Sequence, residues 1–248
     1  MNYILRLASL LLLLVLWQLA STHFGPRLLP APFSVLTAIT SEARSGALFA
    51  NLAATLARVA VSFFLAMSFG AVIGIAMGRY PALDRIADSW IVILLNLPAL
   101  VIIVLAYVWI GLNEVAAIGA VALNKLPNAI VTVREGARAL NRELDEVAQV
   151  FRMSAWVRLR HVILPQLAPY IAAAARSGLS LVWKIVLVVE LMGRSNGIGF
   201  EIGVAFQLFD IRLLLAYAIP FVIVMLAIET FLVQPFERHV ARWRFRPA

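Results

Sequence analysis

The chain has 248 residues, of which 63% are hydrophobic and 14% charged, and it contains no cysteine. Soluble globular domains carry about 25% charged residues, so this composition excludes an ordinary soluble domain and indicates a polytopic helical membrane protein. The absence of cysteine excludes disulfides and cysteine-ligated metal sites. The formal charge of +8 comes mostly from arginines in connecting segments, so it informs membrane topology more than nucleic-acid binding.

Two apolar runs, separated by a proline-rich connection, occupy the first third of the chain. Residues 4–20 predict a retained membrane helix, with a cleavable signal peptide as the alternative because the run is short for a span. Residues 52–78 predict the second span. Small residues recur at every fourth position along it: Ser62, Ala66, Gly70, Gly74 and Gly78. Such a face lets two helix backbones approach, so we expect it to pack against another helix.

The middle of the chain predicts two more spans, over residues 90–110 and 115–133. Pro98 lies inside the third span and frees a backbone carbonyl, which protein or water must satisfy. Asn96 lies in the same span and Lys125 in the next.

The last third predicts a fifth span over residues 170–192 and a sixth over residues 212–233. Between them, residues 193–210 are predicted to form a glycine-rich loop, and residues 234–248 form a basic tail. The predicted fold class is therefore an all-α polytopic membrane protein. It has one transmembrane domain over residues 1–248, with about six spans.

The longest polar segment, residues 141–167, separates the fourth and fifth spans. Its apolar residues recur with helical spacing, at Leu144, Val147, Ala148 and Phe151. Ser154 is placed to cap a second short helix, and Pro165 marks the return to apolar sequence. This helix–turn–helix offers an apolar ridge to the aqueous phase. Its target is either the bilayer surface or a partner protein.

Within this segment, Glu146, Val147 and Ala148 precede Arg152, and Val-Ile-Leu-Pro follows at residues 162–165. The pattern resembles the EAA loop of permease subunits of type I ABC importers, in which a Glu-x-Ala triplet, a glycine and a later Leu-Pro pair recur. Arg152 stands at the glycine position. Residues 29–32 and 55–59 also resemble the nitrate, sulfonate and taurine branch of these permeases.

The resemblance implies that two copies of the chain form a pore in the bacterial inner membrane. Each copy would receive an ABC ATPase subunit at residues 141–164, and an extracytoplasmic solute-binding protein would deliver the solute. The residues expected to couple to the ATPase are Glu146, Ala148, Phe151, Arg152, Ser154, Leu164 and Pro165. A non-glycine residue at position 152 predicts a turn of a different shape, with Arg152 paired to the ATPase or to Glu146.

The distribution of cations predicts the orientation. With the amino terminus in the cytoplasm, 13 of the 21 lysines and arginines lie on the cytoplasmic side, five on the outer side and three in spans. The five outer residues are Arg27, Arg44, Arg58, Arg194 and Arg212. Cytoplasmic segments carry the excess of cations, which places residues 141–167 in the cytoplasm.

The sequence lacks the motifs of an ATPase or a metalloenzyme. A phosphate-binding loop ends in Lys followed by Ser or Thr, but Lys125 is followed by Leu and Lys184 by Ile. The three histidines are far apart in sequence, and no span carries ligands at metal-binding spacing. We therefore expect a transport subunit without a cofactor, a metal or a nucleic-acid partner, whose ATP hydrolysis occurs on another chain.

Polar residues inside the spans are candidates for lining the solute route, because ionisable groups in a bilayer usually face a cavity or a partner. They are Asn96, Lys125, Arg176, Lys184 and Glu190. Lys184 could instead pair with Glu190, although a six-residue offset separates them on a helix. The excess of cations in the spans favours an anionic solute. The alternative function is an ATP-independent secondary transporter or channel, for which the expected internal repeat is not apparent.

Overall fold

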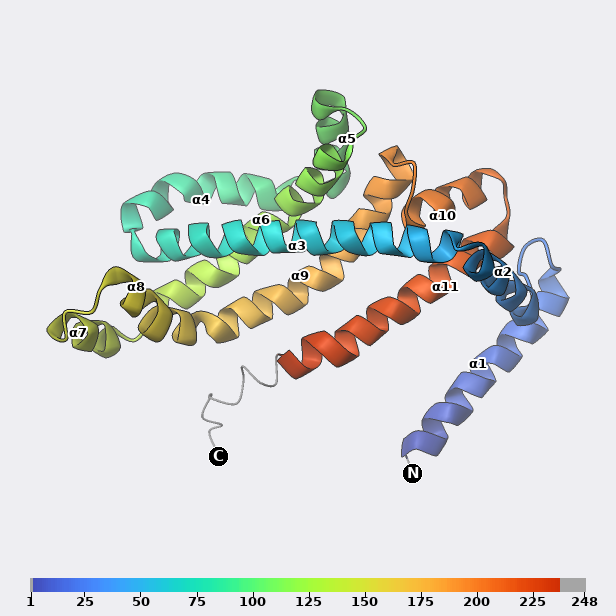
Figure 1. Ribbon diagram of the computed structural model, residues 1–248, viewed down its shortest axis with the longest axis horizontal. Helices are drawn as coiled ribbons and strands as arrows, with labels where there is room; N and C mark the ends of the chain where they lie inside the picture. Colours follow the sequence, from blue (N-terminus) through green and yellow to red (C-terminus); the bar gives the residue numbers. More distant parts are fainter. Residues whose placement is uncertain (1, 237–248) are drawn as a thin grey trace. The chain divides into compact units, whose positions relative to one another are not determined.

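The computed structural model describes residues 2–236, so most of the predicted basic tail lies outside the described residues. Within that range, every regular element is a helix (Figure 1). In chain order these are α1 (Asn2–Phe24), α2 (Pro32–Ser45), α3 (Ala47–Arg79), α4 (Pro81–Asn96), α5 (Ala99–Ile110), α6 (Glu114–Arg138), α7 (Arg142–Val150), α8 (Ala155–Arg158), η1 (Leu159–Ile163), α9 (Leu164–Gly193), α10 (Ile198–Gln207), α11 (Ile211–Ile228) and η2 (Glu229–Val233).

The chain divides into two compact units. Unit 1 comprises Met1–Leu56 and Glu190–Leu226, and unit 2 comprises Ala57–Val189 and Ala227–Ala248. The long helices α3 and α9 each contribute residues to both units.

Four helical segments are long and apolar enough to cross a bilayer: Ala47–Arg79, Glu114–Arg138, Ala155–Gly193 and Ile211–Phe236. A fifth crossing is available if α4 and α5 together form one bent span. The first predicted span lies within α1, where Ala8–Phe24 forms a shorter apolar helix than these four. The described chain is thus an all-helical membrane protein with four or five spans by length and composition.

The third predicted span is not one continuous helix. α4 ends at Asn96 and α5 begins at Ala99, and their axes are bent by 98°. Leu97 and Pro98 between them have extended backbone conformations. The cause is local, because proline disfavours the helical conformation of the preceding residue and lacks an N–H to continue the helix. The predicted third span over residues 90–110 thus contains a break at Pro98, and the two helices on either side of the break can still form one bent span.

The small-residue face of α3 lies directly against α6 in unit 2. A Cβ added to Gly70 would lie 2.5 Å from the Cβ of Ala129. One added to Gly74 would lie 2.7 Å from the carbonyl oxygen of Ile130, and one added to Gly78 would lie 2.5 Å from the Cβ of Ala137. Such distances leave no room for a side chain. The two backbones approach closely because these positions are glycine.

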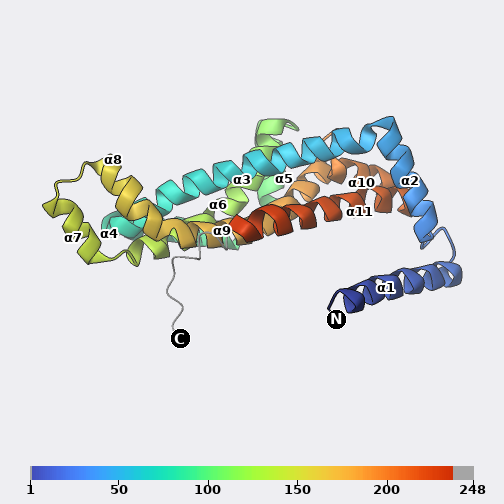
Figure 2. The same ribbon diagram turned by 60° about the horizontal axis from the view of Figure 1, so that its bottom comes forward.

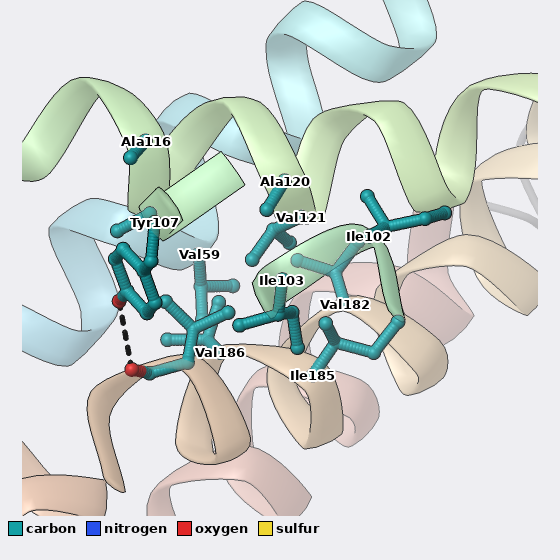
Figure 3. Close-up of a cluster of buried hydrophobic side chains, with 12 residues drawn as sticks. Val59, Ile102, Ile103, Tyr107, Ala116, Ala120, Val121, Val182, Ile185 and Val186 are labelled. Atoms are coloured by element: carbon teal, nitrogen blue, oxygen red, sulfur yellow. Dashed lines mark hydrogen bonds between the residues drawn. The ribbon is translucent and has the colours of Figure 1, made fainter. Parts of the chain in front are cut away.

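The main apolar cluster of unit 2 joins α3, α5, α6 and α9 (Figure 3). Ile103 of α5 and Val121 of α6 are almost completely buried in it, together with Val186 of α9. The Tyr107 hydroxyl donates a 2.8 Å hydrogen bond to the carbonyl oxygen of Val189. This contact satisfies a polar group in an otherwise apolar cluster and ties α5 to α9.

Unit 1 contains a helix where the sequence predicted only a glycine-rich loop. Within residues 193–210, α10 occupies Ile198–Gln207. Three buried side chains accept hydrogen bonds from its amino-terminal N–H groups at 2.8 Å each: Asn51 Oδ1 from Gly197, Thr55 Oγ1 from Ile198 and Glu190 Oε2 from Gly199. Partners distant in sequence thus satisfy the start of this short helix, which explains why local sequence did not reveal it.

Candidate functional site

The segment between α6 and α9 forms two short helices at one end of unit 2 (Figure 2). Asn141 caps the first helix, α7, by accepting a 2.8 Å hydrogen bond from the N–H of Glu143 through Oδ1. The N–H of Asn141 in turn donates to Gln166 Oε1 at 2.9 Å. These contacts fix where α7 begins relative to the base of α9.

Ser154 caps the second helix, α8, where the sequence predicted a cap. Its Oγ accepts a 3.4 Å hydrogen bond from the N–H of Val157. The chain then continues through the π-helical turn η1 directly into α9, so the helix does not end at Pro165. A π-helical turn shifts the hydrogen-bond register by one residue, which accommodates a proline that lacks an N–H.

The turn after α7 has the shape that glycine favours, although Arg152 occupies it. Arg152 has a φ of 47°, in the left-handed region. Its N–H donates to the carbonyl oxygen of Gln149 at 2.9 Å, and the N–H of Met153 donates to that of Ala148 at 2.9 Å. This pair of bonds is a Schellman motif, the common helix ending with a left-handed residue.

The prediction of a different turn at Arg152 is therefore wrong. Two backbone hydrogen bonds hold the residue in a conformation that costs about 1–2 kcal/mol for a side chain with a Cβ. Within the described residues, the Arg152 guanidinium forms no ion pair with Glu146, and both side chains are exposed. The strain at this turn is compensated by the loop's backbone bonds and not by that pair.

The apolar residues of α7 and its turn are mostly unburied. Ala148 is 1% exposed and packs inward. Leu144, Val147, Val150 and Phe151 are exposed, with Phe151 at 72%. In the second half of the segment, Trp156 and Leu164 are also exposed. The segment therefore presents contiguous apolar surface, of the kind that marks a binding site when it lies in water.

Asp145 ties this segment to the end of α3. Its Oδ1 accepts a 3.0 Å hydrogen bond from Arg158 Nε, and its Oδ2 lies 2.6 Å from Arg158 Nη2 and 3.1 Å from Arg79 Nη2. The hydrogen bond from Arg158, together with the charge of Arg79, holds the pKa of the Asp145 carboxyl below its usual range. One carboxylate thus joins α7, α8 and the last residue of α3.

A second ionic cluster braces the neighbouring ends of α4 and α6. Arg134 Nη1 lies 2.5 Å from Asp88 Oδ1 and 3.3 Å from Asp84 Oδ1. Arg138 also pairs with Asp84 and lies 3.0 Å from Glu135. These pairs connect the helix before the bend to the helix that leads into α7.

A cavity of about 380 Å³ in unit 2 brings Lys184 together with two amides. Asn124 and Asn128 line it from α6, and Lys184 lines it from α9. The remaining wall is apolar and includes Leu95, Leu97 and Leu181 among others. One ammonium group and two amides supply hydrogen-bond donors, which suits the oxygens of a small anion.

The other predicted route residues of unit 2 occupy different surroundings. Asn96 donates to the carbonyl oxygen of Val92 within α4 at 2.8 Å. Lys125 is 1% exposed, and its side chain passes over Gly178 of α9. Arg176 Nε lies 3.7 Å from Glu229 Oε1. None of these three is among the residues that line the cavity beside Lys184.

Glu190 lies in unit 1 and is fully buried there. Its Oε2 accepts hydrogen bonds from Thr55 Oγ1 at 2.9 Å and from the N–H of Gly199 at 2.8 Å. A carboxylate with these partners holds the start of α10. These two hydrogen bonds satisfy Oε2 of the buried carboxyl group.

Sequence analysis missed the residues that organise both sites. Asp145, Arg79 and Arg158 are far enough apart in sequence that their pairing had no local signature. Asn124 and Asn128 did carry a signal, because two amides four residues apart in an apolar helix share one face.

Comparison with known proteins shows which family this chain resembles. Residues 66–243 match the family described as "Binding-protein-dependent transport system inner membrane component". A permease protein of Bacillus subtilis strain 168, SsuC, named for aliphatic sulfonate transport, is 31% identical over 216 residues, covering 87% of this chain and 78% of the relative. The taurine transport system permease protein TauC of Escherichia coli K12 is 28% identical, covering 96% and 89% of the two chains.

A third relative is the bicarbonate transport system permease protein CmpB of Synechococcus elongatus. It is 31% identical over 216 residues, covering 82% of this chain and 77% of the relative. Among solved structures, a chain of the MetNI methionine ABC transporter in an inward-facing conformation superposes with a TM-score of 0.64 at 20% identity, covering 76% of this chain and 93% of that one. An amino acid ABC transporter crystallised with histidines gives a TM-score of 0.60, also at 20% identity, covering 81% and 97% of the two chains.

The family match spans most of the chain, the relatives are covered over most of their own length, and the solved structures share the helical fold. The chain therefore belongs to the binding-protein-dependent transport system inner membrane components, as a permease subunit of an ABC importer.

Proposed function

We propose that the segment from Asn141 to Pro165 is the surface that receives the ATPase subunit of the importer. The observation that carries this proposal is the exposed apolar ridge on α7, ending in Phe151, on a segment that the Asp145–Arg79 ion pair fixes to α3. An exposed aromatic side chain on a braced helix end is suited to anchor a protein interface. Glu146 and Arg152 add exposed charges beside it.

The position of this segment supports its coupling role. Asp145 joins it to α3, and α8 continues through η1 into α9. A displacement of α7 by the ATPase would therefore reach two membrane helices through bonded contacts. In this proposal, Ser154, Leu164 and Pro165 keep the second half of the segment in line with α9, and Ala148 seats α7 on its support.

The solute proposed for this importer is a small anion with an oxygen-rich headgroup. The cavity that contains Lys184, Asn124 and Asn128 combines one cation with amide donors and apolar walls. Relatives are named for aliphatic sulfonates, taurine and bicarbonate, each of which carries such a group. In this proposal, Lys184 contacts the solute during passage. Asn96, Lys125 and Arg176 support the helices around the route, and Glu190 holds α10.

The working assembly proposed here is a symmetric pair of these chains with two ATPase subunits and a solute-binding protein outside the membrane. Closed two-fold symmetry is the commonest arrangement of such pairs. Six crossings, with α1 and the bent α4–α5 pair each counted once, would put the start of α1 and the end of α11 on the same side of the membrane, which the proposal takes to be the cytoplasm. That orientation agrees with the excess of cations on the same side.

Reconstitution tests this proposal. The chain, its ATPase subunit and its solute-binding protein are placed in liposomes, and ATP-dependent uptake of taurine, an alkanesulfonate and bicarbonate is measured against a neutral sugar. We expect uptake of at least one of the anionic solutes and none of the sugar, with a strict requirement for ATP. Uptake that continues without ATP or without the ATPase subunit would instead indicate a self-sufficient transporter.

A further inference from the structure

Unit 1 contains a second cavity, remote in sequence from the proposed coupling segment. It has a volume of about 640 Å³ and lies between the α1–α2 connection and the α10–α11 connection. Arg27 and Leu28 line it from the first connection, and Phe209 and Arg212 line it from the second side, where α11 begins. Nothing in the proposed transport route uses these residues.

Phe209 is the most exposed large hydrophobic residue at this cavity, at 85%. It also has a left-handed backbone, with a φ of 55°. Its N–H donates to the carbonyl oxygen of Phe206 at 3.1 Å, and the N–H of Asp210 donates to that of Ala205 at 2.9 Å. These two bonds form a Schellman motif, in which the left-handed position is usually occupied by glycine or asparagine. The ring centroid of Phe209 lies 6.3 Å from that of Phe206, and the rest of the side chain is exposed. An exposed aromatic residue held in a left-handed conformation points to a functional role.

Two unpaired cations flank this aromatic side chain. Within residues 2–236, neither Arg27 nor Arg212 forms a hydrogen bond or an ion pair, and both are exposed. The one carboxylate at the cavity, Asp210, is engaged as the cap of α11, accepting a 2.9 Å hydrogen bond from the N–H of Leu213. The free charge of the surface is therefore positive.

The first side of the cavity is fixed in shape. Trp17 Nε1 donates a 3.0 Å hydrogen bond to the carbonyl oxygen of Pro30, and the N–H of Leu29 donates to that of Gly25 at 3.0 Å. Gly25 has a φ of 84°, which permits this tight turn. A preformed surface of this kind loses little conformational entropy when it binds a partner.

We infer that this surface, comprising Arg27, Leu28, Phe209 and Arg212, is where the extracytoplasmic solute-binding protein docks, with Phe209 as its anchor. The inference rests on the proposed function. In the proposed topology, α1 and α9 each cross the membrane from the cytoplasm, so the α1–α2 and α10–α11 connections that line the cavity lie on the extracytoplasmic side. The cationic rim requires an acidic patch on the binding protein, which would steer its approach.

An anionic lipid headgroup is the competing occupant, since arginines near helix ends also contact headgroups. The left-handed backbone conformation that fixes the Phe209 side chain favours a protein as the occupant over a lipid headgroup. A fluid lipid needs no defined side-chain geometry, and glycine at position 209 would relieve the strain without disturbing a headgroup site. The two occupants give different results in the experiment below.

The test measures binding of the solute-binding protein that supports uptake in the reconstituted system. The transporter is embedded in nanodiscs of phosphatidylcholine, with or without phosphatidylglycerol. The variants are Phe209→Gly and the double change Arg27→Gln with Arg212→Gln. The matched controls are Phe49→Ala, an exposed phenylalanine of unit 1 away from the cavity, and Arg44→Gln, another exposed arginine of unit 1.

We expect Phe209→Gly to raise the melting temperature, because the strain is removed, and to weaken binding about tenfold or more, as loss of an anchor does. The double arginine variant should weaken binding and flatten its salt dependence, since fewer charges steer the encounter. Both variants should retain basal ATP hydrolysis, and both controls should bind as the wild type does.

Wild-type affinity in both variants would overturn the inference, and so would a lower melting temperature for Phe209→Gly, which would mark Phe209 as structural. A loss of response to phosphatidylglycerol with unchanged protein binding would assign the surface to lipid and overturn it as well. Because uptake by the wild type is established first, these outcomes remain separate from a failure of the proposed function.

Discussion

Gly74 offers the sharpest stability test of the α3–α6 packing. In Gly74→Ala, the new Cβ would lie 2.7 Å from the carbonyl oxygen of Ile130, 3.0 Å from the Cβ of Val133 and 3.1 Å from the backbone nitrogen of Arg134. Two of these three neighbours are backbone atoms, which cannot rotate away. The helices must therefore separate locally to admit the methyl group.

The size of the effect follows from two opposing contributions. Overpacking a close contact costs about 1–3 kcal/mol. Replacing glycine by alanine in a helix returns up to about 1 kcal/mol of helix propensity. The net change for Gly74→Ala should be a destabilisation of about 1–2 kcal/mol, and the bulkier Gly74→Leu should exceed it.

Gly119→Ala is the matched control, because Gly119 lies within α6 and an added Cβ there meets nothing within 4 Å. The same gain in propensity applies without the clash, so this variant should be neutral or up to about 1 kcal/mol more stable. The assay is reversible unfolding of the purified chain in detergent micelles, with the free energy of unfolding as the readout. If Gly74→Ala proves as stable as Gly119→Ala, the close approach of α3 and α6 is not what requires glycine.

Three further changes probe the proposed coupling segment and the proposed solute cavity. Arg152→Gly should stabilise the segment by at most about 1 kcal/mol, because relief of left-handed strain is partly offset by the entropy of glycine. Loss of solute-stimulated ATP hydrolysis in this variant would show that the guanidinium itself takes part. Asp145→Asn should destabilise by about 1–2 kcal/mol, since two arginines lose a shared carboxylate. Because the pKa of Asp145 is lowered, the stability difference between the wild type and Asp145→Asn, measured by thermal unfolding, should stay constant between about pH 6 and 8. It should disappear only as acid protonates the Asp145 carboxylate. A smaller loss of stability than that caused by Glu146→Gln would refute the bracing role of Asp145. Lys184→Met should lower uptake of an anionic solute in proteoliposomes while the complex stays assembled, and undiminished uptake would place Lys184 outside the route.

Sequence reasoning succeeded where structure follows from local pattern. The period of apolar residues before Phe151 and the cap at Ser154 are properties of a few neighbouring residues, and both helices form where that pattern lies. The glycines of α3 signalled a close helix contact in the same way, because their spacing alone defines a smooth face.

The features that sequence analysis did not predict have different causes. α10 was missed because its first N–H groups bond to Asn51, Thr55 and Glu190, which lie on other helices. Sequence analysis placed Pro98 inside the third span but did not predict the direction of the bend there, because hydropathy carries no information on helix direction. At Arg152, sequence reasoning predicted that the backbone of the turn would avoid the left-handed conformation, because the residue is not glycine. Instead, the two backbone bonds of the Schellman motif hold the residue in the turn.

The central claim is that Phe151 and its segment couple this permease to its ATPase. The most direct measurement is ATP hydrolysis by the reconstituted complex with and without the solute-loaded binding protein, for Phe151→Ala and for Phe231→Ala. Phe231 is 76% exposed and Phe151 is 72% exposed, so the two changes remove the same side chain from similar exposure. The account predicts that Phe151→Ala releases the ATPase or abolishes its stimulation by solute, with normal membrane insertion, and that Phe231→Ala leaves both intact. Full ATPase binding and full stimulation in Phe151→Ala would contradict it.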